Sequence, residues 1–215
     1  EQIAFVESRH EELREAYLEQ EQTRVELRRK VTQLTALHRA GLLFSSTLDR
    51  EALMQKVLEA LTSDLHYDRA MISFYDPVRQ VVRDARAFGV SPEIQAFARA
   101  REIPVTDPMS PEGIVLLQGQ PLLVGDVREV WDRIHPLNQQ LALLTQAKSW
   151  IAVPLKIKDR IFGSLMVDRI QAHSLTQDDL ELMITVAHQV AIALDNASAY
   201  EQIEALNVGL EAKVR

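Results

Sequence analysis

The sequence predicts an α/β (α+β) fold: an antiparallel sheet flanked by helices, with long N-terminal and C-terminal coiled-coil helices. Two stretches, 70–88 and 149–167, each contain two short runs of strand character around a turn, as hairpins do. Residues 1–47 and the residues after 176 instead repeat apolar side chains at helical spacing. We expect an N-terminal coiled-coil helix over 1–35, one domain over 36–199 and a C-terminal helix over 200–215.

The N-terminal segment has the heptad pattern of a coiled coil. It contains no Pro and no Gly before Gly41, and apolar residues recur at the a and d positions over five to six heptads. His10, Gln20 and Arg24 interrupt this seam, and polar seam residues set register at a cost in stability. A long helix needs packing, so we predict a parallel homodimer; the alternative is a solvated single helix. The predicted seam residues of this segment are Leu13, Leu27, Val31 and Leu34.

Local signals predict the elements of the domain in chain order. Asp49 is the expected N-cap of a helix with an apolar stripe, and Ser91 and Ser110, each followed by Pro, begin two further helices. Between 102 and 126 the chain is rich in Pro and Gly, which favours loops. The expected strands are 70–75, 81–88, 122–124, 149–157 and 161–167, and a helix is expected over 136–146.

The last helix begins at Ser174 or Thr176 and has acidic residues in its first turn. No Pro interrupts it, and about 40 residues at a rise of about 1.5 Å make a rod of roughly 60 Å. A small domain cannot cover that length, so we expect the far half to pair with another helix. The predicted seam residues of this half are Ile203, Leu206 and Leu210.

The segment 149–167 resembles the central strand pair of the GAF family. The runs "VPL" at 153–155 and "GSL" at 163–165 are similar to the family's "VPL" and "G-x-L" motifs, whose glycine lets another backbone approach. The tail over 206–215 is similar to linkers that lead from GAF domains to histidine kinase or diguanylate cyclase domains. The resemblance covers 36–199 and is to GAF domains of multidomain bacterial signalling proteins, of the sensor histidine kinase or cyclase type.

This resemblance implies a function in signal transduction. Such a module would dimerise and relay a small-molecule or conformational signal through its coiled-coil helices to an output domain, in the cytoplasm. The alternative is a ligand-free interaction module that serves only dimerisation and spacing. The chain starts with Glu and ends within a helical pattern, so we expect a piece of a longer protein whose output domain can be a kinase or a cyclase.

The composition narrows the chemistry that we expect. The chain has no Cys, which removes the attachment site of covalent bilins and the thiol chemistry of free methionine sulfoxide reductases of this fold. The cyclic-nucleotide motif of GAF domains has no match, and the six His show neither metal-ligand spacing nor a clear haem ligand. We therefore expect no cofactor, no metal and no catalytic residue in this chain.

Charge and hydropathy limit the classes of partner that we expect for this chain. A net charge of −7 argues against nucleic acid, and no apolar run approaches the roughly 20 residues of a membrane span, so we expect no membrane contact by this chain. The expected partners are a second copy of the chain and an unidentified small molecule.

The resemblance implies a ligand pocket between the sheet and the Pro-rich middle of the chain. A buried Arg there would favour an anionic ligand through paired hydrogen bonds. Arg83 and Arg86 are three residues apart on a strand, so we expect them to face opposite sides of the sheet. For the two Trp residues, core packing is the alternative to ligand contact. The candidate pocket residues are Tyr75, Arg83, Arg86, Trp131, His135 and Trp150.

Overall fold

The computed structural model describes residues 13–24 and 49–214, and the chain divides into two units, 1–40 and 41–215. In the first unit, residues 13–24 form a helix with almost entirely exposed side chains; Leu13 is 70% exposed. The seam residues Leu27, Val31 and Leu34 lie outside the described residues. The N-terminal coiled coil therefore stays a prediction.

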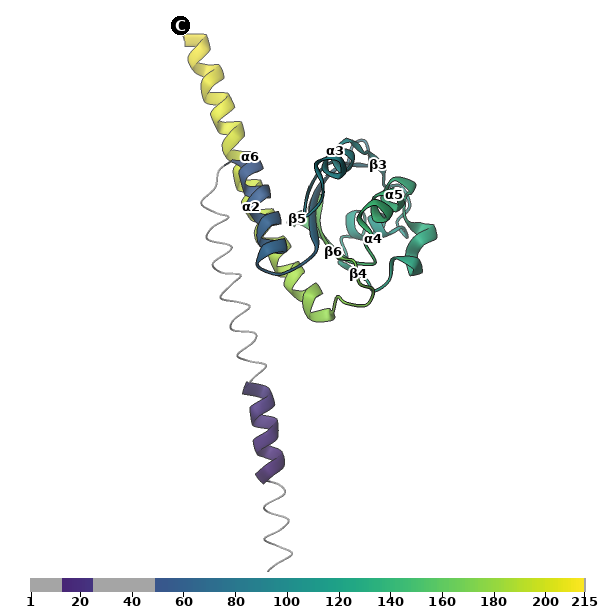
Figure 1. Cartoon of the computed structure of the whole chain (residues 1–215). Coiled ribbons are helices and arrows are strands. Elements are labelled where there is room, and N and C mark those ends of the chain that lie inside the picture. Colours follow the sequence, from purple (N-terminus) through teal and green to yellow (C-terminus); the bar gives the residue numbers. More distant parts are fainter. Residues whose placement is uncertain (1–12, 25–48, 215) are drawn as a thin grey trace, which may run out of the picture. The chain divides into compact units, whose positions relative to one another are not determined.

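The second unit is built on an antiparallel sheet of six strands in the order β3-β2-β1-β6-β5-β4 (Figure 1). The long hairpins β1–β2 and β5–β6 meet in the middle, where β1 pairs with β6. This confirms the predicted α+β fold and its antiparallel sheet. The strands are β1 (Arg69–Asp76), β2 (Val81–Phe88), β3 (Ile103–Pro104), β4 (Leu122–Val124), β5 (Ser149–Ile157) and β6 (Arg160–Arg169).

Helices cover both faces of this sheet. Two of them, α2 (Arg50–Ser63) and α6 (Gln177–Val214), pack on one face, and shorter helices lie over the other (Figure 1). The predicted caps are confirmed, since Asp49, Ser91 and Ser110 each accept a hydrogen bond from the first turn of the helix that follows. None of the described helices is both long and apolar enough to cross a membrane. The shorter helices are α3 (Pro92–Ala100), α4 (Pro111–Leu116), the 3-10 helix η1 (Val127–Arg133) and α5 (Pro136–Thr145).

The first half of α6 belongs to the core of its own domain. Val190 and Leu194 are at most 2% exposed, and the helix packs on β5. The apolar stripe of α6 is therefore used against the sheet up to Leu194, and Ala197 beyond it is also fully buried. Ile203, a predicted seam residue, is 56% exposed. Leu206 and Leu210 lie on the same helix, but their side chains are outside the described part of the structure.

Gly163 has the role expected from its motif, and Pro154 lies where a ladder donor is dispensable. At Gly163, a Cβ would lie well inside contact distance of the Ser73 carbonyl oxygen on β1. Pro154 pairs with Ser164 on one side, while β4 reaches only as far as Ala152 on the other. The missing N–H of Pro154 therefore interrupts no ladder with β4.

Candidate ligand site

A cavity of about 110 Å³ lies between the sheet and the helices α3, α4 and α5. One buried water needs only about 10–15 Å³, so this space suits a small organic molecule better than a lone water. Apolar side chains form most of the wall. They include Val82, Val115, Leu116, Ile134, Leu141, Ala152 and Met166.

The sheet contributes a row of polar side chains to the cavity. Alternate residues of a strand share a face, and Ser73 on β1 and Ser164 on β6 both line the cavity. Their hydroxyl oxygens are 2.9 Å apart, at hydrogen-bond distance. Farther along the same strands, Arg69 and Asp168 are paired in register and form a close ion pair.

Asp168 is 8% exposed, and the pKa of its carboxyl group is raised to about 6. Burial is the main cause, because loss of water penalises the charged form. Arg69 acts in the opposite direction and holds the pKa of Asp168 below what burial alone would give. The ion pair is thus what allows a carboxylate at this position near neutral pH.

Arg101, the residue that ends α3, brings a buried cation to the cavity. It is 6% exposed, and its Nη2 donates to the thioether sulfur of Met71 at 3.1 Å. Its Nε and Nη1 have no hydrogen-bond partner among the described residues. A thioether is a weak acceptor, so the guanidinium leaves most of its hydrogen-bonding capacity unused.

Burial lowers the pKa of Arg101 to about 10, with the nearby Glu112 acting in the opposite direction. Arg101 is therefore a cation at neutral pH. A buried charge without partners costs free energy, because it has lost water and gained little in return.

Glu112 and Asn138 add to the polar lining from the helix side. They lie in the first turns of α4 and α5, and the Asn138 amide donates to Glu112 Oε1 at 2.5 Å. Thr145, the last residue of α5, is a further polar residue of the lining. Within 13–24 and 49–214, no three His, Asp or Glu side chains are grouped as a metal site would require.

Of the candidate residues, Trp150 lines the cavity, and it is 7% exposed. Trp131 is partly buried against the neighbouring apolar cluster and is not part of the lining. His135 caps α5 instead, since its Nδ1 accepts a hydrogen bond from the Leu137 N–H at 3.2 Å. Tyr75 packs at the edge of the apolar cluster and lines a separate hollow beside α6.

Arg83 and Arg86 face the same side of the sheet, so the expectation of opposite sides is wrong. Arg83 pairs with Phe74 and Arg86 with Ile72, which places one extra residue in β2 as a bulge. Asp84 lies in this bulge with a φ of 54°, which Asp tolerates better than most residues. Neither arginine lines the cavity: Arg86 contacts α2, and Arg83 pairs with Asp76 at the end of β1.

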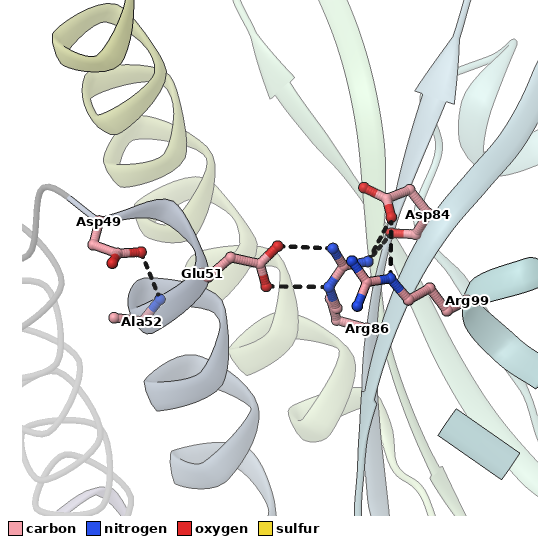
Figure 2. Close-up of polar contacts among 6 residues, drawn as sticks. All are labelled: Asp49, Glu51, Ala52, Asp84, Arg86 and Arg99. Atoms are coloured by element: carbon pink, nitrogen blue, oxygen red, sulfur yellow. Dashed lines mark hydrogen bonds and ion pairs between the residues drawn. The ribbon is translucent and has the colours of Figure 1, made fainter. Parts of the chain in front are cut away.

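On that side, Arg86 links β2 to α2 (Figure 2). Its guanidinium donates to both carboxylate oxygens of Glu51, at 2.7 and 3.2 Å, and to Asp84 at 2.6 Å. Arg99, on α3, approaches the same Asp84 carboxylate at 3.8 Å. The four charged residues connect α2 to the helix that ends at Arg101.

Replacing Glu51 with Gln is expected to lower the free energy of unfolding by about 0.5–1 kcal/mol. Arg86 is 16% exposed at its side chain and would lose its bidentate partner, while Glu51 itself is 65% exposed. Urea denaturation measures this loss. Glu59→Gln removes the same charge from an exposed site on the same helix and is the control, with an expected change near zero. Equal effects of the two variants would contradict the assigned contact.

Most polar residues of the cavity could not be found from the sequence. Arg69, Arg101, Glu112 and Asn138 come from four separate elements, and no local motif joins them. Asp168 gave no signal of its own, because it lies just beyond the predicted strand 161–167 and is followed by Arg169 at the end of β6.

Comparisons with known proteins agree with this architecture. A model of the GAF domain family matches residues 49–194. The circadian input-output histidine kinase CikA of Thermosynechococcus vestitus is 27% identical over 100 residues, which are 46% of this chain and 14% of that protein. The chain thus corresponds to a small part of this curated relative.

Solved structures share the fold. The GAF domain of a phosphoenolpyruvate-protein phosphotransferase from Acinetobacter has a TM-score of 0.64 and 15% identity, over 80% of this chain and 98% of that one. A free methionine-R-sulfoxide reductase from Neisseria meningitidis, in complex with its substrate, has a TM-score of 0.62 and 18% identity, over 76% and 89%. At these identities the likeness shows a common fold.

Proposed function

Since this chain belongs to the GAF domain family, we propose that it is a sensory and regulatory module that binds a small molecule and relays its binding through paired helices. The observation that carries this proposal is the cavity, which holds the unsatisfied cation Arg101 on one face of a sheet whose other face supports α2 and α6. We further propose that the module acts in the cytoplasm and regulates a kinase or cyclase domain. It needs no catalytic residue of its own for this role.

Strand β6 is the structural basis of the proposed relay. Its residues alternate, so that Ser164, Met166 and Asp168 line the cavity while Leu165 and Val167 are fully buried in the core beneath the helices. Close-packed interiors transmit small displacements instead of absorbing them. A ligand that shifts β6 from the cavity side would therefore shift the surface on which α6 rests.

Helix α6 can carry such a shift beyond the domain. It runs without Pro from Gln177 to Val214, and the 20 residues after Leu194 extend about 30 Å at the usual helical rise. A ligand changes the balance between two helix arrangements only through its different affinities for them. A tenfold preference corresponds to about 1.4 kcal/mol, which biases the populations without forcing them to one side.

In the proposed parallel dimer, Ile203→Asp is expected to weaken association about tenfold or more, because a charge would enter an apolar seam. Ile203 is 56% exposed in the single chain, so the domain itself should stay folded. Sedimentation at several concentrations measures the dimer constant. Ile170→Asp is the matched control, since Ile170 is also half exposed, at 51%, but follows β6 in a loop. A wild-type chain that stays monomeric at micromolar concentration would contradict the dimer.

The relay can be tested by distances between protomers. The chain has no Cys, so a single Glu204→Cys on the exposed far half of α6 gives one spin-label site per protomer. We expect the inter-protomer distance distribution to change when a cavity ligand, found by thermal-shift screening, saturates the protein. An unchanged distance distribution at saturating ligand would contradict the relay and favour the alternative, in which the module serves only dimerisation and spacing.

A further inference from the structure

We propose that the ligand of this cavity is a small monocarboxylate with an apolar body, whose carboxylate binds Arg101. This inference rests on the proposed function, since it names the class of molecule that the cavity would sense. Three features of the cavity point to this class. They are the unsatisfied buried charge of Arg101, the balance of charges in the lining, and the apolar wall.

Arg101 supplies the reason for an anion. Its side chain is more than nine-tenths buried, lines the cavity and has two nitrogen atoms without a partner in the described part of the chain. Its third nitrogen contacts only the Met71 sulfur, which a carboxylate oxygen would outcompete as an acceptor. A planar guanidinium matches a carboxylate in a bidentate pair, and such a pair would satisfy the donors that the protein leaves unmet.

The charge balance favours a single negative charge. Among the described residues, two arginines and no Lys line the cavity, and Arg69 is already neutralised by Asp168. Glu112 lies close enough to oppose the lowering of the Arg101 pKa by burial, although the two side chains form no ion pair. A doubly charged phosphate would find one available cation and two nearby carboxylates, whereas a carboxylate needs only the one cation.

The walls favour an apolar body behind that carboxylate. The Trp150 ring lies on the sheet side, and Val115, Leu116 and Leu141 come from α4 and α5. Burying an aliphatic chain there gains about 0.8 kcal/mol per methylene. The cavity of about 110 Å³ limits this body to a short chain or a small ring.

The experiment compares six-carbon probes that differ only in their polar end. Hexanoate, norleucine, hexanamide and hexylammonium, together with inorganic phosphate, are titrated into the full chain by calorimetry and by Trp150 fluorescence in a Trp131→Phe background. We expect hexanoate or norleucine to bind at least tenfold more tightly than hexanamide, and hexylammonium and phosphate not to bind. Norleucine binding better than hexanoate would identify an amino acid as the source of the carboxylate, with Glu112 facing its ammonium group.

The variant Arg101→Met keeps the size and shape of the side chain and removes its charge. It is expected to weaken hexanoate binding about 10- to 100-fold, as loss of a charged hydrogen-bond pair does. Arg101→Gln is the second variant, should the first fail to fold, and the same loss is expected. Arg99→Met is the matched control, because it removes a charge from the same helix outside the cavity and should change the affinity less than twofold.

Four results would overturn the inference. Hexanamide binding as tightly as hexanoate, or phosphate binding more tightly, would reject the carboxylate class. Unchanged hexanoate binding in Arg101→Met would reject Arg101 as the group that binds the carboxylate. Each of these results leaves a ligand-binding cavity standing. No binding of any probe also overturns it. The proposed sensory function then depends on the inter-protomer distances with a screened ligand, which use none of these probes.

Discussion

Replacing Arg69 with Met is expected to destabilise the domain by about 3–5 kcal/mol at pH 7, the usual cost of breaking a buried ion pair by removing one partner. Arg69 and Asp168 are in close contact on neighbouring central strands, and their side chains are 11% and 12% exposed. Without Arg69, the Asp168 carboxylate would be left charged and buried, or would have to take up a proton.

The size of this loss should depend on pH in a defined direction. The folded-state pKa of Asp168, about 6, lies above its ordinary value of 3.8. Between these values the folded protein holds a proton that the unfolded chain has lost, so the contribution of Asp168 to stability falls as pH rises from about 4 to 6. In Arg69→Met the pKa rises further, and the deficit relative to wild type should shrink on acidification by at most about 1.4 kcal/mol per pH unit.

The double variant Arg69→Met/Asp168→Leu is the decisive control. An apolar pair of similar volume often replaces a buried ion pair at little cost, so we expect stability within about 1 kcal/mol of wild type. Urea denaturation of wild type, both single variants and the double variant at pH 5 and pH 7 measures these differences. A double variant as unstable as Arg69→Met would mean that the loss comes from packing and not from an unpaired charge.

Gly163→Ala is expected to lower the free energy of unfolding by about 3 kcal/mol or more, at or above the upper end of overpacking costs. The new Cβ would collide with the Ser73 carbonyl oxygen, a backbone atom of the central strand β1 that cannot rotate away. The strands β1 and β6 would have to separate at the centre of the sheet. Thermal unfolding followed by circular dichroism measures the loss.

Ser164→Ala, one residue along the same strand, is the matched control for Gly163→Ala. It adds no atom and removes only the hydroxyl contact with Ser73, so the expected loss is about 1 kcal/mol. If both variants melt at the same temperature, the close approach of β1 to Gly163 is not the reason why position 163 requires glycine.

The fold was predictable from the sequence because its signals are local. Strand alternation, the caps at Asp49, Ser91 and Ser110, and the Pro-free run of α6 each depend on neighbours within a few residues. Such signals depend on backbone geometry and helix-end hydrogen bonds, and these do not need knowledge of the tertiary structure.

The cavity was predictable only in part, because its polar residues come together through tertiary structure. Trp150 was among the candidate pocket residues and lines the cavity, whereas Arg69 and Arg101 are 32 positions apart in sequence and carry no shared pattern. The orientation of Arg83 was missed because one bulge residue, Asp84, reverses the alternation of β2. A strand's two-residue period does not reveal where an extra residue is inserted.

The central claim is that occupancy of the cavity and pairing of the helices are coupled, and thermodynamic reciprocity tests it most directly. If a carboxylate such as hexanoate in the cavity alters helix pairing, then helix pairing must alter hexanoate affinity, by the same factor for each molecule bound. The measurement is the hexanoate dissociation constant of the dimeric wild type and of the Ile203→Asp monomer, with the wild-type dimer constant determined with and without hexanoate. We expect the two affinities to differ about fivefold or more, and the dimer constant to shift by the square of that factor, because each dimer contains two cavities. Equal affinities, with a dimer constant that hexanoate leaves unchanged, would contradict the coupling.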